Sequence, residues 1–387
     1  MDASGFDPGY RSLTDDSRSL AERLRIIHEA LRVRFPGIGR IAVALYDPGT
    51  DTVKTFAHAS DTEEPLVHYE AHLADVPSLQ ALAAEGGHRI VGDLTDYGNG
   101  NTTHTRRVRE AYRSSVTWPL YRNGNLAGFL FFNSREPDYF TEDVVTGLDF
   151  ARELIILLVV NTLKTVEAIR STAAVAKEVS HYRDEETGSH LERIAHYARL
   201  VARVLAGEHG LSDEFVELVY LFAPLHDLGK VAIPDNVLLK PGRLTDEEFA
   251  IMRTHAAKGD EMAERIVEGA GLDPERHGHI LRAIVRHHHE AWDGSGYPDG
   301  LAGEAIPLAA RVTAIGDVYD ALTSSRPYKK AWTPDEAADL LRRESGTKFD
   351  PACVRAFLDN FEEVQAIARL FVNDETFPDV DTAARSA

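Results

Sequence analysis

The chain has 387 residues, which is enough for two domains that each bury a core. With 43% hydrophobic and 27% charged residues, its composition is ordinary for a globular protein and excludes a fibrous or wholly disordered chain. The formal net charge of −20 argues against binding of a nucleic acid polymer or an anionic membrane, because both need a basic surface.

Two further features bear on the cell compartment. The single cysteine, Cys353, excludes an internal disulfide and a CxxC metal site, fits a reducing environment and is expected to be buried. Residues 1–16 lack the basic flank and apolar run of a secretory signal, and the longest apolar stretch, 154–160, is too short to span a bilayer. We therefore expect a cytoplasmic protein.

The amino-terminal third carries the pattern of a sheet with helices. Residues 1–17 have no periodicity and are expected to form a flexible tail, whereas apolar residues at helical spacing in 20–31 predict a helix that packs on the following sheet. Within 40–134, five runs are rich in β-branched and aromatic residues: IAVALYD, TVKTFAH, HRIVGD, SVTWPLY and LAGFLFF. The Asn-Gly pair of RNGN, at 122–125, predicts a hairpin turn between the last two runs.

The segment VTWPLYRNGNLAGFLFF resembles the closing strands of GAF domains, although PAS domains have a comparable sheet. We therefore expect residues 18–140 to form a GAF-like sensor domain, an α+β unit with an antiparallel sheet and flanking helices. The resemblance implies a small ligand of unknown identity, or pairing with a second copy of the domain. No cysteine is present there to attach a bilin, and His68, His72 and His104 are expected at the surface rather than as haem ligands.

A long linker helix is predicted over 141–180, with Thr141 as its N-cap, because this stretch has no proline and a single glycine, Gly147. Four small or β-branched residues within it repeat at a 3-4-3 spacing: Val166, Ile169, Ala173 and Ala176. This spacing suits a paired-helix seam, and hence a homodimer, although the same residues could pack on their own domain.

The remainder, residues 181–371, is predicted to form an all-α bundle, with 372–387 as a second flexible tail. Thr245 and Glu248 have the spacing of a capping box, which places His255 inside the helix that they open. A break rich in glycine and proline, DGSGYPDGLAGEAIP, cannot continue a helix. Two further helices are predicted after it, at 308–322 and 334–344.

Carboxylates and imidazoles recur between residues 186 and 317 at spacings that suit a cluster of metal ions. Glu186 and His190 lie four residues apart, so they share one face of a helix. In the adjacent pair His226-Asp227, the imidazole can take one ion while the two carboxylate oxygens can bridge to a second. Further candidates are His255, the run His287-His288-His289, and Asp317.

Each of these motifs alone could be an exposed ion pair or a solvated turn. However, eleven of the seventeen histidines fall between His181 and His289, which favours a metal site. The donors are nitrogen and oxygen without thiolate, which argues against a structural zinc knot and favours iron or manganese, with zinc, nickel and cobalt left open.

Several motifs in register resemble the HD-GYP family of cyclic di-GMP phosphodiesterases, a branch of the metal-dependent HD phosphohydrolases. They are ETGSH, LHDLGK followed by IPD and LLKPG, MRTHAAKG, HHE before DGSGYP, IGDVYDAL and TSSRPYK. The resemblance covers roughly residues 180–360. It implies hydrolysis of cyclic di-GMP to pGpG, and on to GMP, in bacterial second-messenger signalling. It also implies regulation by the GAF-like domain and a diguanylate cyclase (GGDEF) as a partner.

The resemblance also implies a ligand set of two or three divalent ions. One ion would be held by His190, His226, Asp227 and Asp317. A second would be held by His255, His288 and His289, with Asp227 bridging the two. Glu186 matches the carboxylate that accompanies a third metal in some members, and His287 is the spare histidine of the run.

Catalytic roles are implied for Asp227 and for Lys230, whose ammonium group can meet a phosphate oxygen. The implied substrate contacts are Lys230, Gly296, Tyr297, Pro298, Arg326 and Lys329. Ala291 departs from the family pattern, which usually has a basic residue after HHE. Two alternatives stay open at this point: a hydrolase of another cyclic dinucleotide or nucleotide, and a cyclic di-GMP receptor that does not hydrolyse it.

Overall fold

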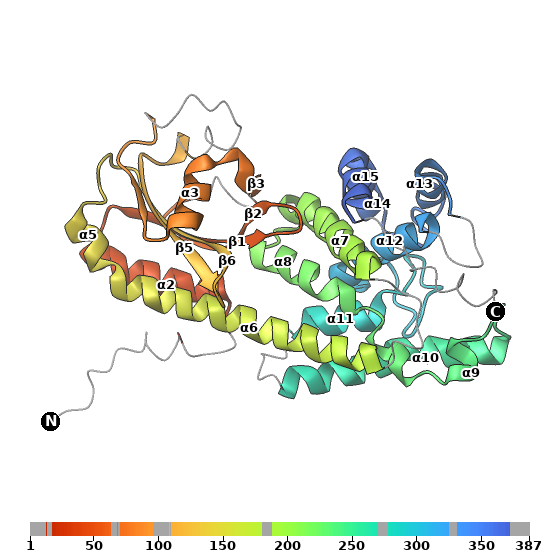
Figure 1. Ribbon diagram of the computed structural model, residues 1–387. Coiled ribbons are helices and arrows are strands. Elements are labelled where there is room, and N and C mark those ends of the chain that lie inside the picture. Colours follow the sequence, from red (N-terminus) through yellow and green to blue (C-terminus); the bar gives the residue numbers. More distant parts are fainter. Residues whose placement is uncertain are drawn as a thin grey trace, which may run out of the picture.

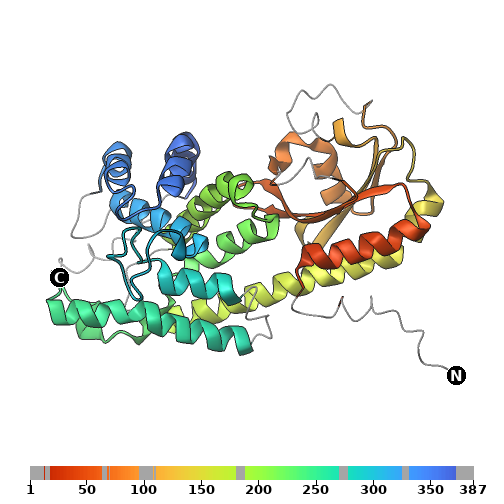
Figure 2. The ribbon, with the colours of Figure 1, turned by 180° about the vertical axis from the view of Figure 1, so that it is seen from behind.

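The computed structural model describes residues 13, 18–62, 68, 70–95, 108, 110–179, 188–269, 278–324 and 331–371, with only the backbone at 165–166, 169–170 and 172–179. A sheet with flanking helices forms one end of the molecule, and a bundle of helices forms the other (Figure 1). One long helix runs along both, as the view from behind also shows (Figure 2).

The sheet has six antiparallel strands in the order β3-β2-β1-β6-β5-β4. The strands are β1 (Ile38–Asp47), β2 (Thr52–Ser60), β3 (Glu70–His72), β4 (Arg89–Val91), β5 (Ser114–Arg122) and β6 (Asn125–Ser134). Alternate side chains of β1, β5 and β6 bury one face against helices α2 (Leu20–Arg34) and α6 (Asp149–Val179). The other face packs on α3 (Pro77–Glu85) and on the short turn η1 (Leu73–Asp75).

Local signals in this part act as predicted, except at one strand. Asn123 and Gly124 have φ angles of 52° and 82° between β5 and β6, which is the left-handed geometry of a tight hairpin turn. All five predicted runs contain a strand. The three-residue strand β3 was not predicted, because Glu70–His72 has no strand-like composition and joins the sheet only through its pairing with β2.

The prediction of one unbroken helix over 141–180 was wrong at Leu148. Thr141 does cap a helix, accepting a hydrogen bond from the N–H of Val144, but this helix is the short α5 (Glu142–Gly147). Gly147 packs on Phe35, since a Cβ there would lie 2.5 Å from the aromatic ring, and the chain turns at Leu148 before α6 begins. The side chains of the proposed seam lie outside the described part of the chain: Val166, Ile169, Ala173 and Ala176.

Helices and turns make up the described part of the carboxy-terminal half. The helices are α7 (Gly188–His209), α8 (Asp213–Phe222), α9 (Asp235–Leu238), α10 (Asp246–Gly269), α11 (His279–His287), α12 (Leu308–Thr323), α13 (Pro334–Arg343), α14 (Pro351–Asp359) and α15 (Phe361–Leu370). Short 3-10 turns are η3 (Ala223–Leu225), η4 (Leu228–Ala232) and η6 (Gly303–Ala305). The predicted helices 308–322 and 334–344 are confirmed as α12 and α13.

The bundle core centres on α7. Tyr197 of α7 meets the rings of Tyr319 and Phe357 edge to face at 5.5 and 5.7 Å, and Cys353 is buried beside them, as expected. The predicted fold class is therefore confirmed: an α+β domain with an antiparallel sheet, joined by a long helix to an all-α bundle. Among the described residues, none of the helices has the length and apolar character needed to cross a bilayer.

The two ends of the molecule are in direct contact through buried charges. Asp213, at the start of α8, accepts a hydrogen bond of 2.7 Å from the backbone N–H of His68. The same carboxylate lies 2.8 Å from Nδ1 of His68 and 3.2 Å from Nδ1 of His58 in β2. Only 2% of the Asp213 side chain is exposed, so water does not screen these contacts.

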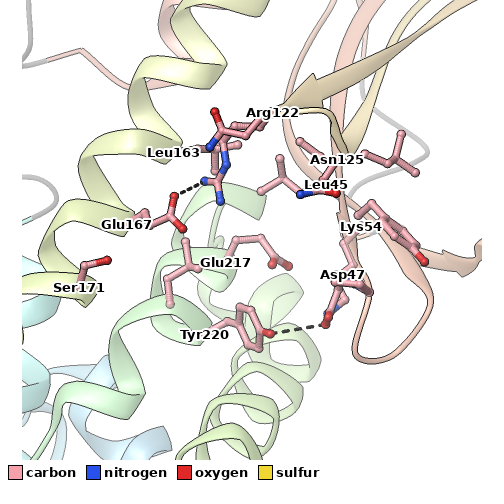
Figure 3. A pocket seen from close by; sticks show the side chains of 16 residues that line it. Leu45, Asp47, Lys54, Arg122, Asn125, Leu163, Glu167, Ser171, Glu217 and Tyr220 are labelled. Atoms are coloured by element: carbon pink, nitrogen blue, oxygen red, sulfur yellow. Dashed lines mark hydrogen bonds and ion pairs between the residues drawn. The ribbon is translucent and has the colours of Figure 1, made fainter. Parts of the chain in front are cut away.

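A second polar contact lies between α7, α8 and β3. Arg199 binds both Glu217 of α8, at 2.6 Å, and Glu70 of β3, at 2.7 Å. Beside it, a cavity of about 860 Å³ opens between the β1–β2 turn, the β5–β6 hairpin, α6 and α8 (Figure 3). Arg122 and Glu167 form an ion pair of 2.7 Å at its edge.

Two glycines set the position of the turn η4. A Cβ on Gly229 would lie 1.9 Å from the carbonyl oxygen of His255 and 2.6 Å from the nitrogen of Gly259. The backbones of η4 and α10 therefore touch without an intervening side chain. This contact places the residue just before η4, Asp227, opposite His255.

The close contact predicts the effect of one added methyl group. Gly229→Ala should lower the free energy of unfolding by about 1–3 kcal/mol, because the backbone of α10 must move away. Chemical denaturation would measure this change. Gly207→Ala is the control, since its Cβ meets no atom within 4 Å in α7 and alanine favours a helix by up to about 1 kcal/mol. Equal stability of Gly229→Ala and the native chain would contradict the packing argument.

Candidate metal centre

Seven of the eight predicted metal ligands converge in two groups. Asp227, His255, His288 and His289 form one group, and His190, His226 and Asp317 form the other. Within each group the candidate ligand atoms lie within 4.8 Å of one another. They come from α7, the link between η3 and η4, α10, the end of α11 and α12. The eighth, Glu186, lies outside the described residues.

Asp227 lies between the two groups, and its two oxygens face different ones. Oδ1 is 3.2 Å from Nε2 of His255 and 3.6 Å from Nε2 of His288. Oδ2 is 3.2 Å from Nε2 of His226 and 2.8 Å from Nζ of Lys230. A carboxylate placed in this way can bridge two cations.

Backbone carbonyl groups orient three of the imidazoles. Nδ1 of His226 donates to Ala223, that of His255 to Met252 and that of His288 to Ile284. The distances are 2.9, 2.7 and 3.0 Å, respectively. These bonds hold the proton on Nδ1, so that Nε2 carries the lone pair that faces the centre.

The protonation states of these groups fit a cation. Burial lowers the pKa of His288 and, further, of His289, so both rings stay neutral at ordinary pH. Burial alone would raise the pKa of Asp227, but the positive charge of Lys230 holds it well below its ordinary value. His288 and His289 are therefore neutral and Asp227 is ionised, which are the forms that ligate metals.

One contact tests directly whether the residues fit a metal. Nε2 of His255 and Oδ1 of Asp227 are both acceptors, yet they face each other at 3.2 Å. Both atoms, and Nε2 of His288, are buried with no hydrogen-bond partner in the described part of the chain. Such groups are costly to bury unless a cation lies between them. The donor set therefore fits a divalent ion.

His190 is oriented by a side chain instead of the backbone. Its Nδ1 lies 2.6 Å from Oδ2 of Asp320, and Nε of Arg193 donates to Oδ1 of Asp320 at 2.5 Å. The sequence analysis missed both Asp320 and Arg193. Helical spacing was the available signal, since Asp320 follows Asp317 by three residues on α12 and Arg193 follows His190 by three on α7.

Three predicted substrate contacts lie in the loop that follows the run of histidines: Gly296, Tyr297 and Pro298. The ring of Tyr297 is 4.8 Å from that of His289, and burial raises the pKa of Tyr297, so its phenol stays neutral. The backbone of Gly296 packs directly on that of Ala291, since a Cβ added to Gly296 would lie 2.2 Å from the backbone nitrogen of Ala291. Pro298 follows in the same loop and is half-buried.

Three other predicted residues remain, two of which the structure does not describe. Arg326 and Lys329 lie outside the described residues. His287 belongs to neither ligand group, and its Nε2 lies 3.0 Å from Oδ2 of Asp299.

Comparison with known proteins matches residues 180–353 to the family described as HD domain. The cyclic di-GMP phosphodiesterase response regulator RpfG of Xanthomonas campestris is 44% identical over 218 residues, which cover 55% of this chain and 54% of that protein. A cyclic di-GMP phosphodiesterase of Vibrio cholerae is 46% identical over 220 residues, covering 54% and 43%.

A further relative, the 3'3'-cGAMP-specific phosphodiesterase 2 of Vibrio cholerae, is 40% identical over 185 residues, covering 48% of this chain and 33% of that protein. This chain thus spans about half the length, or less, of these curated relatives.

Solved structures resemble the chain more weakly. The chromophore-binding domain of a bacteriophytochrome from R. palustris gives a TM-score of 0.31 at 17% identity, covering 39% of this chain and 57% of that one. The phycocyanobilin-bound GAF domain of a cyanobacterial phytochrome gives 0.31 at 15% identity, covering 39% and 91%. Both TM-scores are too low to identify two folds as the same.

The adjacent histidines 287 and 288 provide a matched pair of variants. Loss of a group that only orients a ligand is expected to weaken metal binding by about 10- to 100-fold. His288→Ala should weaken binding of one ion by more than this, because it removes a ligand itself. His287→Ala should bind metal like the native chain, because His287 faces Asp299. Metal-to-protein ratios after dialysis against Mn²⁺ would measure both. Equal metal content in the two variants would refute the assignment of His288.

Proposed function

We propose that the chain is a metal-dependent phosphodiesterase of the HD domain family, which its residues 180–353 match, and that it hydrolyses cyclic di-GMP to pGpG, and on to GMP. The single observation that carries the proposal is the position of Asp227 between two groups of ligands. The names of the relatives at 44% and 46% identity support the choice of substrate.

In this proposal, one ion is bound by His190, His226, Asp227 and Asp317, and the other by Asp227, His255, His288 and His289. Glu186 is proposed as a ligand of a third ion. Iron or manganese suits these nitrogen and oxygen donors. When bound, two divalent ions supply Lewis acidity toward the phosphodiester and lower the pKa of a water molecule.

The side chains of the centre have distinct roles in the proposed reaction. Asp227 would be a ligand of both cations, because its two oxygens face different ligand groups. Lys230 is 22% exposed and ends 2.8 Å from Asp227, so its ammonium group can turn to a phosphate oxygen that arrives at the centre. Tyr297 lies against His289 and shields this side of the centre from water.

The other proposed substrate contacts surround this centre. Arg326 and Lys329 are proposed to bind phosphate groups, because Arg and Lys supply the positive charge that the acidic chain otherwise lacks. Gly296 and Pro298 keep the loop around Tyr297 close to the backbone that follows the three histidines.

Regulation by residues 18–140 belongs to the same proposal. We assign them to a sensor domain for a small ligand, with α6 as the linker to the catalytic domain at 181–371. Pairing of two linker helices would give a homodimer. A diguanylate cyclase is the proposed partner, because it would make the cyclic dinucleotide that this chain consumes.

A second candidate substrate is 3'3'-cGAMP. The observation in its favour is the relative at 40% identity whose name specifies this compound. Metal ions contact phosphates rather than bases, so the ligand groups by themselves accept either dinucleotide. The surroundings of the bases would then decide between them.

A panel of substrates would test the proposed activity. Protein loaded with Mn²⁺ or, without oxygen, with Fe²⁺ should convert cyclic di-GMP to pGpG and GMP faster than 3'3'-cGAMP, with products separated by chromatography. Faster turnover of 3'3'-cGAMP would favour the second candidate. Tight binding of cyclic di-GMP without any product would identify a receptor and refute the enzyme proposal.

Lys230 can be tested separately from the metals. Lys230→Ala should reduce kcat/KM by about 10²- to 10³-fold, the range for loss of one group that stabilises developing charge. Its metal content should stay unchanged, because an ammonium group is not a ligand. Lys348→Ala, at an exposed lysine, is the control. Unaltered kcat/KM in Lys230→Ala would remove Lys230 from the mechanism.

A further inference from the structure

Arg193 connects His190 to a region outside the metal centre. Its Nε and Nη2 grip the two oxygens of Asp320 at 2.5 and 2.9 Å, and Asp320 in turn holds Nδ1 of His190 at 2.6 Å. Only 6% of the Arg193 side chain and 1% of the Asp320 side chain are exposed. This paired geometry fixes the plane of the carboxylate, and hence the direction of the His190 ring.

The remaining arm of Arg193 reaches the end of α15. Nη1 donates to the carbonyl oxygen of Phe371 at 2.6 Å. The ring of Phe371 stacks on His196, one helical turn after Arg193 on α7, with centroids 4.8 Å apart and planes 20° apart. Burial lowers the pKa of His196 to about 4, so this contact is made by a neutral ring. Phe371 is therefore held by two residues of α7.

The β1–β2 turn of the amino-terminal domain touches this same point. A Cβ on Gly49 would lie 3.6 Å from the ring of Phe371, and Oδ2 of Asp47 is 3.8 Å from Nε2 of His196. Asp47 is fixed by an ion pair of 2.7 Å with Lys54, and the hydroxyl of Tyr220 in α8 lies 3.5 Å from it (Figure 3). The β1–β2 turn therefore contacts Phe371, whose carbonyl oxygen accepts a hydrogen bond from Arg193.

We propose that Arg193 is a positioning residue that couples contact with the β1–β2 turn to His190, so that docking of the amino-terminal domain sets the metal affinity of the His190 group. The physical reason is that a planar guanidinium with partners on both sides cannot shift toward one without changing the other. A displaced Phe371 therefore rotates or releases Asp320. The inference rests on the proposed function only in that the His190 group binds a metal.

The test is a double-mutant cycle in the full chain, with Mn²⁺ affinity as the readout, obtained by counting free Mn²⁺ through electron paramagnetic resonance. Arg193→Met should weaken the site by about 10- to 100-fold, as for loss of an outer partner. Gly49→Val, which adds methyl groups against Phe371, should weaken it severalfold in the native background. In the Arg193→Met background, Gly49→Val should have little further effect, because the connection is already broken.

Arg203→Met is the matched control. Arg203 lies on the same helix and also joins it to the amino-terminal domain and α15, through Glu70 at 3.2 Å and Glu363 at 2.8 Å. Among the described residues, Arg203 makes no hydrogen bond or ion pair with Asp320, so its loss should leave Mn²⁺ affinity unchanged. If Arg193→Met unfolds, Arg193→Lys keeps the buried charge without the fork and should show a smaller loss of affinity.

The outcomes separate this inference from the proposed function. The coupling would be overturned if Arg193→Met bound Mn²⁺ with native affinity, or if the effects of Arg193→Met and Gly49→Val on that affinity simply multiplied. Either result would leave the enzyme proposal intact. A chain that binds Mn²⁺ with the expected non-additivity but hydrolyses no cyclic dinucleotide would uphold the coupling and refute the enzyme. A native chain that binds no Mn²⁺ would overturn both.

Discussion

The carboxylate of Asp227 is the constraint on which the carboxy-terminal half depends. A buried carboxylate is stable only if positive charge or hydrogen bonds compensate for its lost hydration. Lys230 supplies one charge, but Oδ1 faces the lone pairs of His255 and His288. The helices that carry these groups must therefore hold mutually repelling acceptors together. The glycine contact between η4 and α10 contributes to this, because it lets two backbones meet where any side chain would separate them.

The ligands are not all held in the same way. His226, His255 and His288 are oriented by carbonyl groups of their own helical turns, so their directions follow from local backbone structure. His190 depends on Asp320 and Arg193, from positions far apart in the chain. A ligand held by local structure is insensitive to distant changes, whereas one held by a side-chain network can respond to them. His190 is the ligand of this second kind.

The contact between the two ends of the chain is made largely by buried charges. Asp213 faces two histidines, and Arg199 binds two glutamates, one from each end. Buried ion pairs add little net stability compared with apolar packing, but a misaligned pair is strongly unfavourable. Such a contact therefore favours one relative placement of the domains, and a change that disturbs one pair affects the whole interface.

Local signals in the sequence determined much of the fold, because they act through the preferences of single turns. The Asn-Gly pair specified the β5–β6 hairpin, Thr141 and Thr245 capped their helices, and runs rich in β-branched and aromatic residues indicated the strands. The candidate ligands were also predicted from the sequence, through the concentration of histidines in one part of the chain and through the family resemblance of the motifs around them.

Only the tertiary structure decided where these elements meet. The break at Leu148 arises because Gly147 packs on Phe35, over a hundred residues earlier in the chain. Likewise, the two oxygens of Asp227 face ligand groups from segments that are distant in sequence. The connection from the β1–β2 turn through Arg193 to Asp320 also joins segments that are far apart in the chain. Such contacts depend on the packing of whole helices, for which a single sequence carries no local signal.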